Sequence, residues 1–188
     1  MPDDPWEKAL ALSVAIDYGS PRSLATLYLV FRDISIVVLF ILIAAIFVAA
    51  EIALISLRES QVRQLENQGK RGMRVAKLSA NPNRFLAAAQ VGITFSGFLS
   101  AALGSERLGV RLEPRLRELG LSSGASKTLS IVAITIGISY VSLVIGELVP
   151  KRLALYKPEL ISMAAAPTID RIAIFFRPII WLLSKSTD

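Results

Sequence analysis

Two glutamates stand inside long apolar stretches of the sequence, where a charged side chain is costly. The chain has 21 basic and 15 acidic side chains, and all but two of them lie outside residues 34–57, 85–104 and 128–149. The two exceptions are Glu51 and Glu147. A carboxylate inside a membrane span usually faces a cavity, a partner or an ion, so both residues are candidates for a functional site.

Glu147 is the stronger candidate because the sequence predicts a helix break beside it. Pro150 has no N–H, so it leaves the carbonyl of residue 146 without its usual helical hydrogen bond. That residue is Gly146, which has no side chain to shield the carbonyl. A carboxylate beside a free carbonyl at a broken helix is a recurrent cation site in transporters. The alternative interpretation is a structural charge near the end of the helix.

Glu51 lies among Ala49, Ala50 and Ala53, and these small residues allow another helix to approach closely. Its carboxylate is either a second cation ligand or a structural partner for a hydroxyl or a basic group on a facing helix. The residue types and their spacing leave both interpretations open.

Polar and small residues recur at intervals of three or four along the other two stretches. Gln90 and Thr94 place an amide and a hydroxyl on one helix face. Small residues form similar ladders, which favour close helix packing or dimerisation. The alternative to a packing role is that Gln90 and Thr94 are ion ligands. The ladders are Gly92, Ser96, Ser100 and Gly104 in the second stretch, and Thr135, Ser139, Ser142 and Gly146 in the third.

Composition narrows the chemistry further. The sequence contains no cysteine and no histidine. This excludes disulfides, thiol nucleophiles, Ser-His-Asp triads and metal sites built on thiolate or imidazole. A metal would have to be bound by oxygen, which favours hard cations such as Mg²⁺ or Ca²⁺. Three spans leave little of the 188 residues for a soluble catalytic domain, so we expect no enzyme activity.

The elements that position these residues are three membrane-spanning helices, which predicts an all-α membrane protein. The stretch 34–57 alone would rise about 36 Å as a helix, enough to cross the bilayer core. Segments 58–84 and 150–188 carry 13 Lys and Arg residues, against 8 in the other two flanking segments. We therefore expect a protein of the inner (plasma) membrane. By the positive-inside rule its N-terminus lies outside and its C-terminus in the cytoplasm. Basic and aromatic residues do not interleave, so we expect no nucleic-acid partner.

The flanks complete the predicted organisation. Residues 1–33 form an extracytoplasmic segment, residues 34–157 the transmembrane domain, and residues 158–188 an amphipathic helix on the cytoplasmic surface. A fourth span over 160–183 is the alternative, although charged residues such as Asp170 interrupt that stretch.

Three blocks of sequence carry a family resemblance. They read FVAAEIALISLRESQVRQL at 47–65, PNRFLAAAQVGITFSGFLSAALG at 82–104, and GELVPKRLAL at 146–155. Together they resemble the transmembrane domain of the CorC and cyclin M (CNNM) magnesium transporter family, in its hemolysin-like bacterial branch. The resemblance extends over about residues 34–185, and its A-E-x-A-L-x-S-L-R and G-E-x-x-P-K motifs are specific in combination.

The resemblance implies three spans and a juxtamembrane helix assembled as a homodimer, with a cytoplasmic CBS-domain pair after residue 188. It also implies Mg²⁺ efflux, with Na⁺ as the proposed coupling ion. By motif, Glu147, Gly146 and Glu51 match positions of the family's ion site.

Some ligand positions differ from the family pattern. Relatives with a defined Mg²⁺ site usually carry a serine beside the first-span glutamate, where this chain has Ala49 and Ala50. They also carry asparagines after the second-span glycine, where this chain has other residues. The side chains that would compensate are Gln90, Thr94, Ser96 and Ser142.

These patterns support one leading hypothesis and one alternative from another class. The leading hypothesis is a dimeric transport domain that moves a divalent cation, Mg²⁺, out of the cytoplasm. The alternative is a non-transporting dimeric anchor or sensor that positions cytoplasmic nucleotide-binding CBS domains. A pore-forming, hemolysin-like role is weaker, because the spans lack the amphipathicity of a lytic helix.

Overall fold

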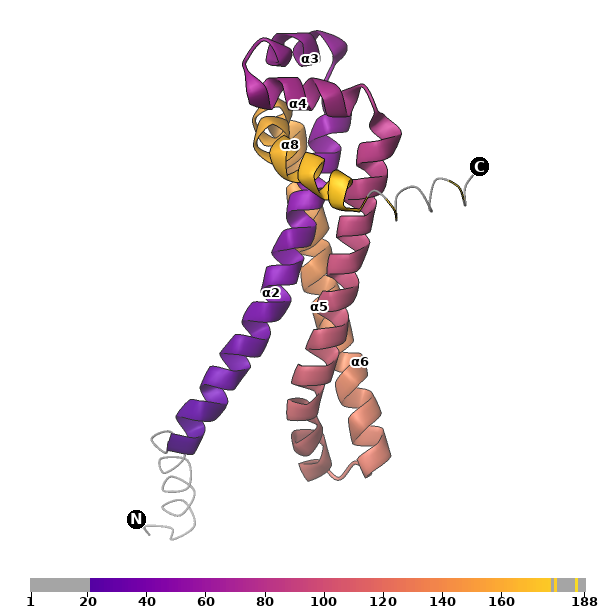
Figure 1. Ribbon diagram of the computed structural model, residues 1–188. Helices are drawn as coiled ribbons and strands as arrows, with labels where there is room; N and C mark the ends of the chain where they lie inside the picture. Colours follow the sequence, from indigo (N-terminus) through magenta and orange to yellow (C-terminus); the bar gives the residue numbers. More distant parts are fainter. Residues whose placement is uncertain (1–20, 177, 179–184, 186–188) are drawn as a thin grey trace.

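The computed structural model describes residues 21–176 together with Pro178 and Lys185, and this part of the chain is helical, without any strand (Figure 1). This confirms the predicted all-α class. In chain order the elements are α2 (Pro21–Ser56), α3 (Glu59–Glu66), α4 (Lys70–Ser79), α5 (Pro82–Glu118), α6 (Ser123–Val141), the π-helix η1 (Ser142–Leu148), α7 (Val149–Tyr156) and α8 (Pro158–Phe175).

Three helical segments are long and apolar enough to cross a membrane, which confirms the three predicted spans. The chain is therefore a multi-pass membrane protein with its helices in a lipid bilayer. The segments are Leu24–Ser56, Phe85–Glu118 and Ser123–Tyr156.

The first two helices are longer than the predicted spans. Helix α2 begins at Pro21 rather than at residue 34, so the described part of the predicted extracytoplasmic segment belongs to this helix. Helix α5 continues to Glu118, well past residue 104. The difference arises because hydropathy shows where the apolar residues end, and this need not be where the helix ends. A helix can continue through charged residues when those charges find partners, as they do here.

The third span does not break at Pro150, contrary to expectation. Helix α6 passes into the π-helix η1, in which the N–H of Val149 donates to the carbonyl of Val144, five residues earlier. Helix α7 then continues to Tyr156. Pro150 is the second residue of α7 and directly follows the π-helix, so the helix passes the proline without a break.

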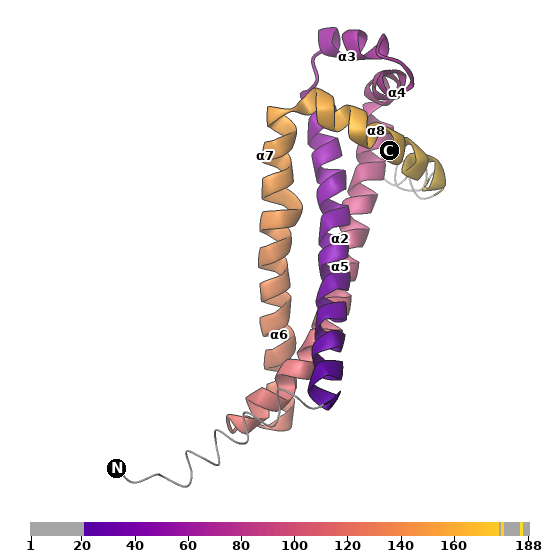
Figure 2. The same ribbon diagram turned by 90° about the vertical axis from the view of Figure 1, so that its left-hand side faces the viewer.

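Helix α2 is the centre of the bundle. It packs along α5 and also contacts η1 and α7, while α6 lies against α5 (Figures 1 and 2). The second-span ladder lies at these contacts. A Cβ at Gly92 would stand 2.5 Å from the Phe47 ring, and one at Gly104 would stand 2.2 Å from Ile138. The Ser100 hydroxyl is buried and donates to the carbonyl of Val37 at 3.4 Å.

The small residues of α5 therefore bring the three spans of one chain together. In the third span, Ser139 is exposed on the surface of the bundle.

The short helices α3 and α4 and the helix α8 cover one end of the bundle, which we call the capped end (Figure 2). Helix α8 lies across this end rather than along the spans, and it is not among the membrane-span candidates of the described residues. Its buried residues Ala165, Ala166 and Ile169 join a core with Phe47 and Val75. The fold thus agrees with a juxtamembrane helix, although the predicted stretch after Phe176 is mostly outside the described residues.

Replacing Gly92 by alanine should destabilise the bundle, because the new methyl group would displace the Phe47 ring from α5. Forced repacking of this kind usually costs about 1–3 kcal/mol. A thermal unfolding experiment on the purified protein in detergent should show a lower midpoint. Gly97→Ala is the matched control in the same helix, since a Cβ there meets nothing within 4 Å. Equal midpoints for the two variants would contradict the packing assigned to Gly92.

Candidate functional site

Glu147 lies in η1, inside the third span, and its carboxylate already has a cationic partner. The Nζ ammonium of Lys151 donates to Oε2 of Glu147 at 3.1 Å. Both side chains are about two-fifths exposed on the surface of the isolated chain. The two residues are one helical turn apart, which places them on the same face. The carboxylate is therefore accessible and can hold a cation.

Gly146 is buried where η1 touches α2. A Cβ at this position would lie 3.4 Å from the Ser142 hydroxyl oxygen, 3.5 Å from Ile41 Cγ2 and 3.7 Å from the Ile41 carbonyl oxygen. Pro150 has no N–H and so donates to neither the Ile145 nor the Gly146 carbonyl. Oxygen atoms from two helices thus gather next to the residue that precedes Glu147.

Glu51 lies on α2 toward the capped end and is half-buried. Helices α2 and α7 run in the same direction, and Gly146 packs on Ile41. Glu51 should therefore stand about 13 Å farther along the bundle than Glu147, at a rise of 1.5 Å per residue. Lys151 lies between these levels and forms its ion pair with Glu147. The two glutamates therefore do not share one ion site in this structure.

The candidate ligands of the second span lie on two sides of α5. Gln90 and Thr94 are exposed, and the Gln90 amide donates to the Thr94 hydroxyl at 3.4 Å. Ser96 is buried in the bundle. The structure therefore does not bring Gln90 and Thr94 to the carboxylate of Glu147 within one chain.

The site is sparse in acidic groups. Within the described residues, no three carboxylates come close enough together to hold a metal ion. The π-helix η1 offers one carboxylate, the hydroxyl of Ser142 and the backbone oxygen of Gly146, and α2 adds the carbonyl oxygen of Ile41. Such a set suits a cation that keeps part of its hydration shell, as Mg²⁺ does.

Two charged features escaped the sequence reasoning. Lys151 was read only as a flanking basic residue, although its spacing of four from Glu147 is the signal for an ion pair. Asp33 was placed outside the spans, yet it is buried and paired with arginines of α5. The interval of four between Arg107 and Arg111 indicates that both arginines lie on one face of the helix. It does not identify Asp33 on α2 as their partner.

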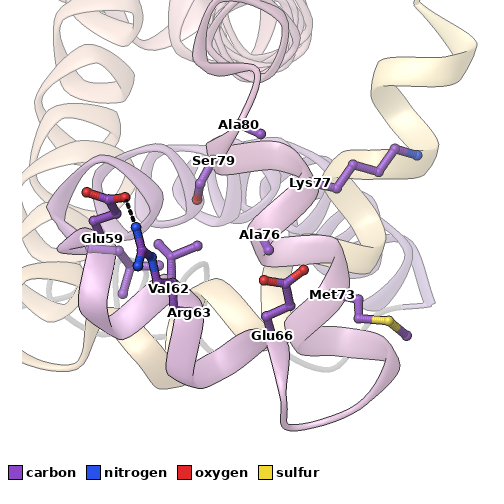
Figure 3. Close-up of a pocket in the computed structure, with 10 residues that line it drawn as sticks. Glu59, Val62, Arg63, Glu66, Met73, Ala76, Lys77, Ser79 and Ala80 are labelled. Atoms are coloured by element: carbon purple, nitrogen blue, oxygen red, sulfur yellow. Dashed lines mark hydrogen bonds and ion pairs between the residues drawn. The ribbon is translucent and has the colours of Figure 1, made fainter.

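A pocket of about 620 Å³ lies between α3 and α4, at the capped end (Figure 3). Glu59 and Arg63 on its wall form an ion pair, while Lys77 points away toward α8, where Asp170 lies 3.7 Å from its Nζ. None of the predicted site residues lines this pocket. The pocket lies outside the three membrane-span candidates, and its residues Glu59, Arg63 and Lys77 pair within the chain, so we do not assign the ion site to it.

Comparison with known proteins places the fold in a family. The model of the cyclin M transmembrane N-terminal domain matches residues 35–188. A UPF0053 protein of Synechocystis, sll0260, is 39% identical over 83% of this chain and 36% of its own length. The polyamine export protein of Haemophilus influenzae is 27% identical over 80% of this chain and 35% of its own. The UPF0053 inner membrane protein YfjD of Escherichia coli is 29% identical over 77% of this chain and 31% of its own length.

The chain thus spans about a third of the length of the curated relatives it matches. The matched region includes the first span from residue 35 onward, the other two spans, the capped end and Glu147 with Lys151. Because the family model covers most of the chain, this protein belongs to the cyclin M transmembrane-domain family.

Proposed function

We propose that the chain is a membrane transport domain that exports a divalent cation, with Mg²⁺ as the cargo and Na⁺ as the candidate coupling ion. One observation carries the proposal. The Glu147 carboxylate lies inside a span and holds a cation, the chain's own Lys151 ammonium, at 3.1 Å. Intramembrane carboxylates with an exchangeable partner mark ion pathways in many transporters. Membership of the cyclin M family supports the same assignment.

In this proposal Lys151 is a built-in counter-ion that the cargo displaces. A partly hydrated Mg²⁺ would bind the Glu147 carboxylate, the Ser142 hydroxyl and the Gly146 carbonyl. The displaced ammonium would move toward Glu51, the next carboxylate along the bundle. Glu147 would then keep a positive partner in both states, which avoids the cost of an uncompensated charge at that residue inside the bilayer.

The π-helix supplies the moving part in this proposal. Wide π turns are uncommon and occur often at functional sites, because a change of hydrogen-bond register there moves a side chain without unfolding the helix. We infer that η1 changes register as the ion passes. Such a change would rotate Glu147 relative to α2 and so alternate the access of the site to the two sides of the membrane.

Orientation and assembly follow from charge and exposure. The excess of basic residues near the capped end supports a cytoplasmic position for it and for the C-terminus, with α2 beginning outside. One relative is named as an inner membrane protein, which supports the plasma membrane as the location. Gln90, Thr94 and Glu147 would face lipid in an isolated chain. A second copy would cover such polar groups, which supports a homodimer, with CBS domains in the full-length protein as cytoplasmic partners.

Polyamine export is the second candidate function. The Haemophilus influenzae relative is named a polyamine export protein. The favouring observation here is that Glu147 holds a primary ammonium, the group that polyamines carry. A non-transporting anchor or sensor for nucleotide-binding CBS domains is the alternative from another class. It predicts no flux of either cation through the full-length protein.

Glu147→Gln should reduce Mg²⁺ flux through the full-length protein in liposomes by at least about tenfold, because an amide cannot replace the charge of a carboxylate ligand. Ion-sensitive dye inside the liposomes measures the flux. Glu118→Gln, an exposed glutamate at the end of α5, is the matched control and should leave the rate unchanged.

Three outcomes separate the candidate functions. Mg²⁺ flux that survives Glu147→Gln would refute the site. Flux of radiolabelled spermidine without Mg²⁺ flux, again sensitive to Glu147→Gln, would favour polyamine export. Absence of both fluxes in the wild type would favour the anchor or sensor.

Lys151→Met should lower the Mg²⁺ concentration needed for half-maximal flux, because the cargo would no longer compete with the ammonium for Glu147. An exposed ion pair contributes up to about 1 kcal/mol, which corresponds to about a fivefold shift. Arg152→Met changes the adjacent, exposed basic residue and controls for the loss of charge. A higher half-maximal concentration, or equal shifts in the two variants, would show that Lys151 is not displaced by the cargo.

A further inference from the structure

A second charged cluster lies at the end of the bundle opposite the capped end. The side chain of Asp33, on α2, is 3% exposed and accepts from three arginines. Arg111 Nη2 lies 2.7 Å from Oδ2, whereas Arg107 Nη1 and Arg32 Nη2 lie 3.2 Å and 3.0 Å from Oδ1. Arg107 and Arg111 belong to α5, so the cluster joins two spans. We call it the arginine cluster.

The arginine cluster has more positive charge than Asp33 can balance. Three guanidinium groups face one carboxylate, which leaves two positive charges in excess. Within the described part of the chain, the nearby Glu113 is paired with Arg117 instead. An excess of this kind in a partly buried position favours the binding of an anion.

One donor in the cluster also lacks an acceptor. The Nε atom of Arg111 is buried and has no hydrogen-bond partner among the residues that the structure describes. A buried donor without an acceptor destabilises a fold, so native proteins usually supply one. The carboxylate of Asp33 accepts four hydrogen bonds and none of them comes from this Nε, so the atom is open to an acceptor from another group.

The position of the cluster indicates where that acceptor comes from. Asp33 directly precedes the apolar stretch 34–57, and Arg107 follows soon after the stretch 85–104. On both helices the cluster therefore lies where the hydrocarbon core gives way to headgroups. The exposed side chains of Phe31 and Val110 lie next to cluster residues in sequence and offer apolar surface for an acyl chain.

We propose that the arginine cluster binds the phosphate group of a membrane phospholipid. Guanidinium groups bind phosphate through paired N–H donors, and basic pockets between spans bind lipid headgroups in this way. Arg111 supplies its unpartnered Nε, and the exposed parts of Arg32 and Arg107 supply further donors. The bound lipid would neutralise the excess charge and would strengthen the junction between α2 and α5. This site is independent of the cation that Glu147 holds.

The test measures stabilisation of the purified full-length protein in detergent as lipid is added. Phosphatidylglycerol should raise the thermal unfolding midpoint, whereas diacylglycerol with the same acyl chains should not. Arg111→Gln should raise the half-maximal lipid concentration by about tenfold or more, the loss expected for a charge-assisted hydrogen bond. Arg115→Gln is the matched control, one turn farther along α5 and exposed. It should leave the lipid response unchanged.

Arg32→Gln provides a second test in case the Arg111 variant does not fold. It removes one excess charge but keeps the contacts of α5 with Asp33, so the protein should fold and bind the lipid several-fold more weakly. Equal stabilisation by diacylglycerol, or equal losses in Arg111→Gln and Arg115→Gln, would overturn the proposal. Full stabilisation by inorganic phosphate, with nothing added by the lipid, would overturn the lipid as the source of the phosphate.

Discussion

The close contact of α5 and η1 with α2 sets the arrangement of the whole bundle. Apolar side chains gain little from touching one another in lipid, because the acyl chains are equally apolar, so spans associate where small residues let them pack closely. Gly92 under Phe47 and Gly146 against Ile41 are such places. The contact at Gly146 also brings backbone and hydroxyl oxygens next to Glu147. Helix packing and the candidate ion site therefore share the same residues.

Charge compensation is the second constraint. Charged groups along the spans are stable only with partners, and this chain supplies them in two ways. Glu147 finds Lys151 on its own helix, whereas Asp33 finds Arg107 and Arg111 on another helix. The first pair can exchange without separating helices. The second holds α2 to α5, so it is suited to a fixed junction rather than to a moving part.

Sequence reasoning predicted the elements well and the details of the site less well. The three spans and the family followed from hydropathy and from the motifs around Glu51 and Glu147. Whether the third span is broken or continuous could not be predicted from the sequence, because a proline near a helix end is compatible with both a break and a continuing helix. The choice depends on the packing of η1 against α2, which no local pattern reports. The pairing of Asp33 with α5 was missed for the same reason, since it joins residues far apart in the chain.

The sequence by itself determined the spans, the exclusion of thiol and imidazole chemistry, and the presence of two carboxylates in apolar stretches. These properties depend on residue type and local spacing, which need no knowledge of neighbours. The packing of the helices is what sets the two glutamates at different depths with Lys151 between them, and what turns Ser96 of α5 inward and Gln90 and Thr94 outward. Those facts depend on how the helices are rotated and offset against one another, and many distant contacts set that arrangement together.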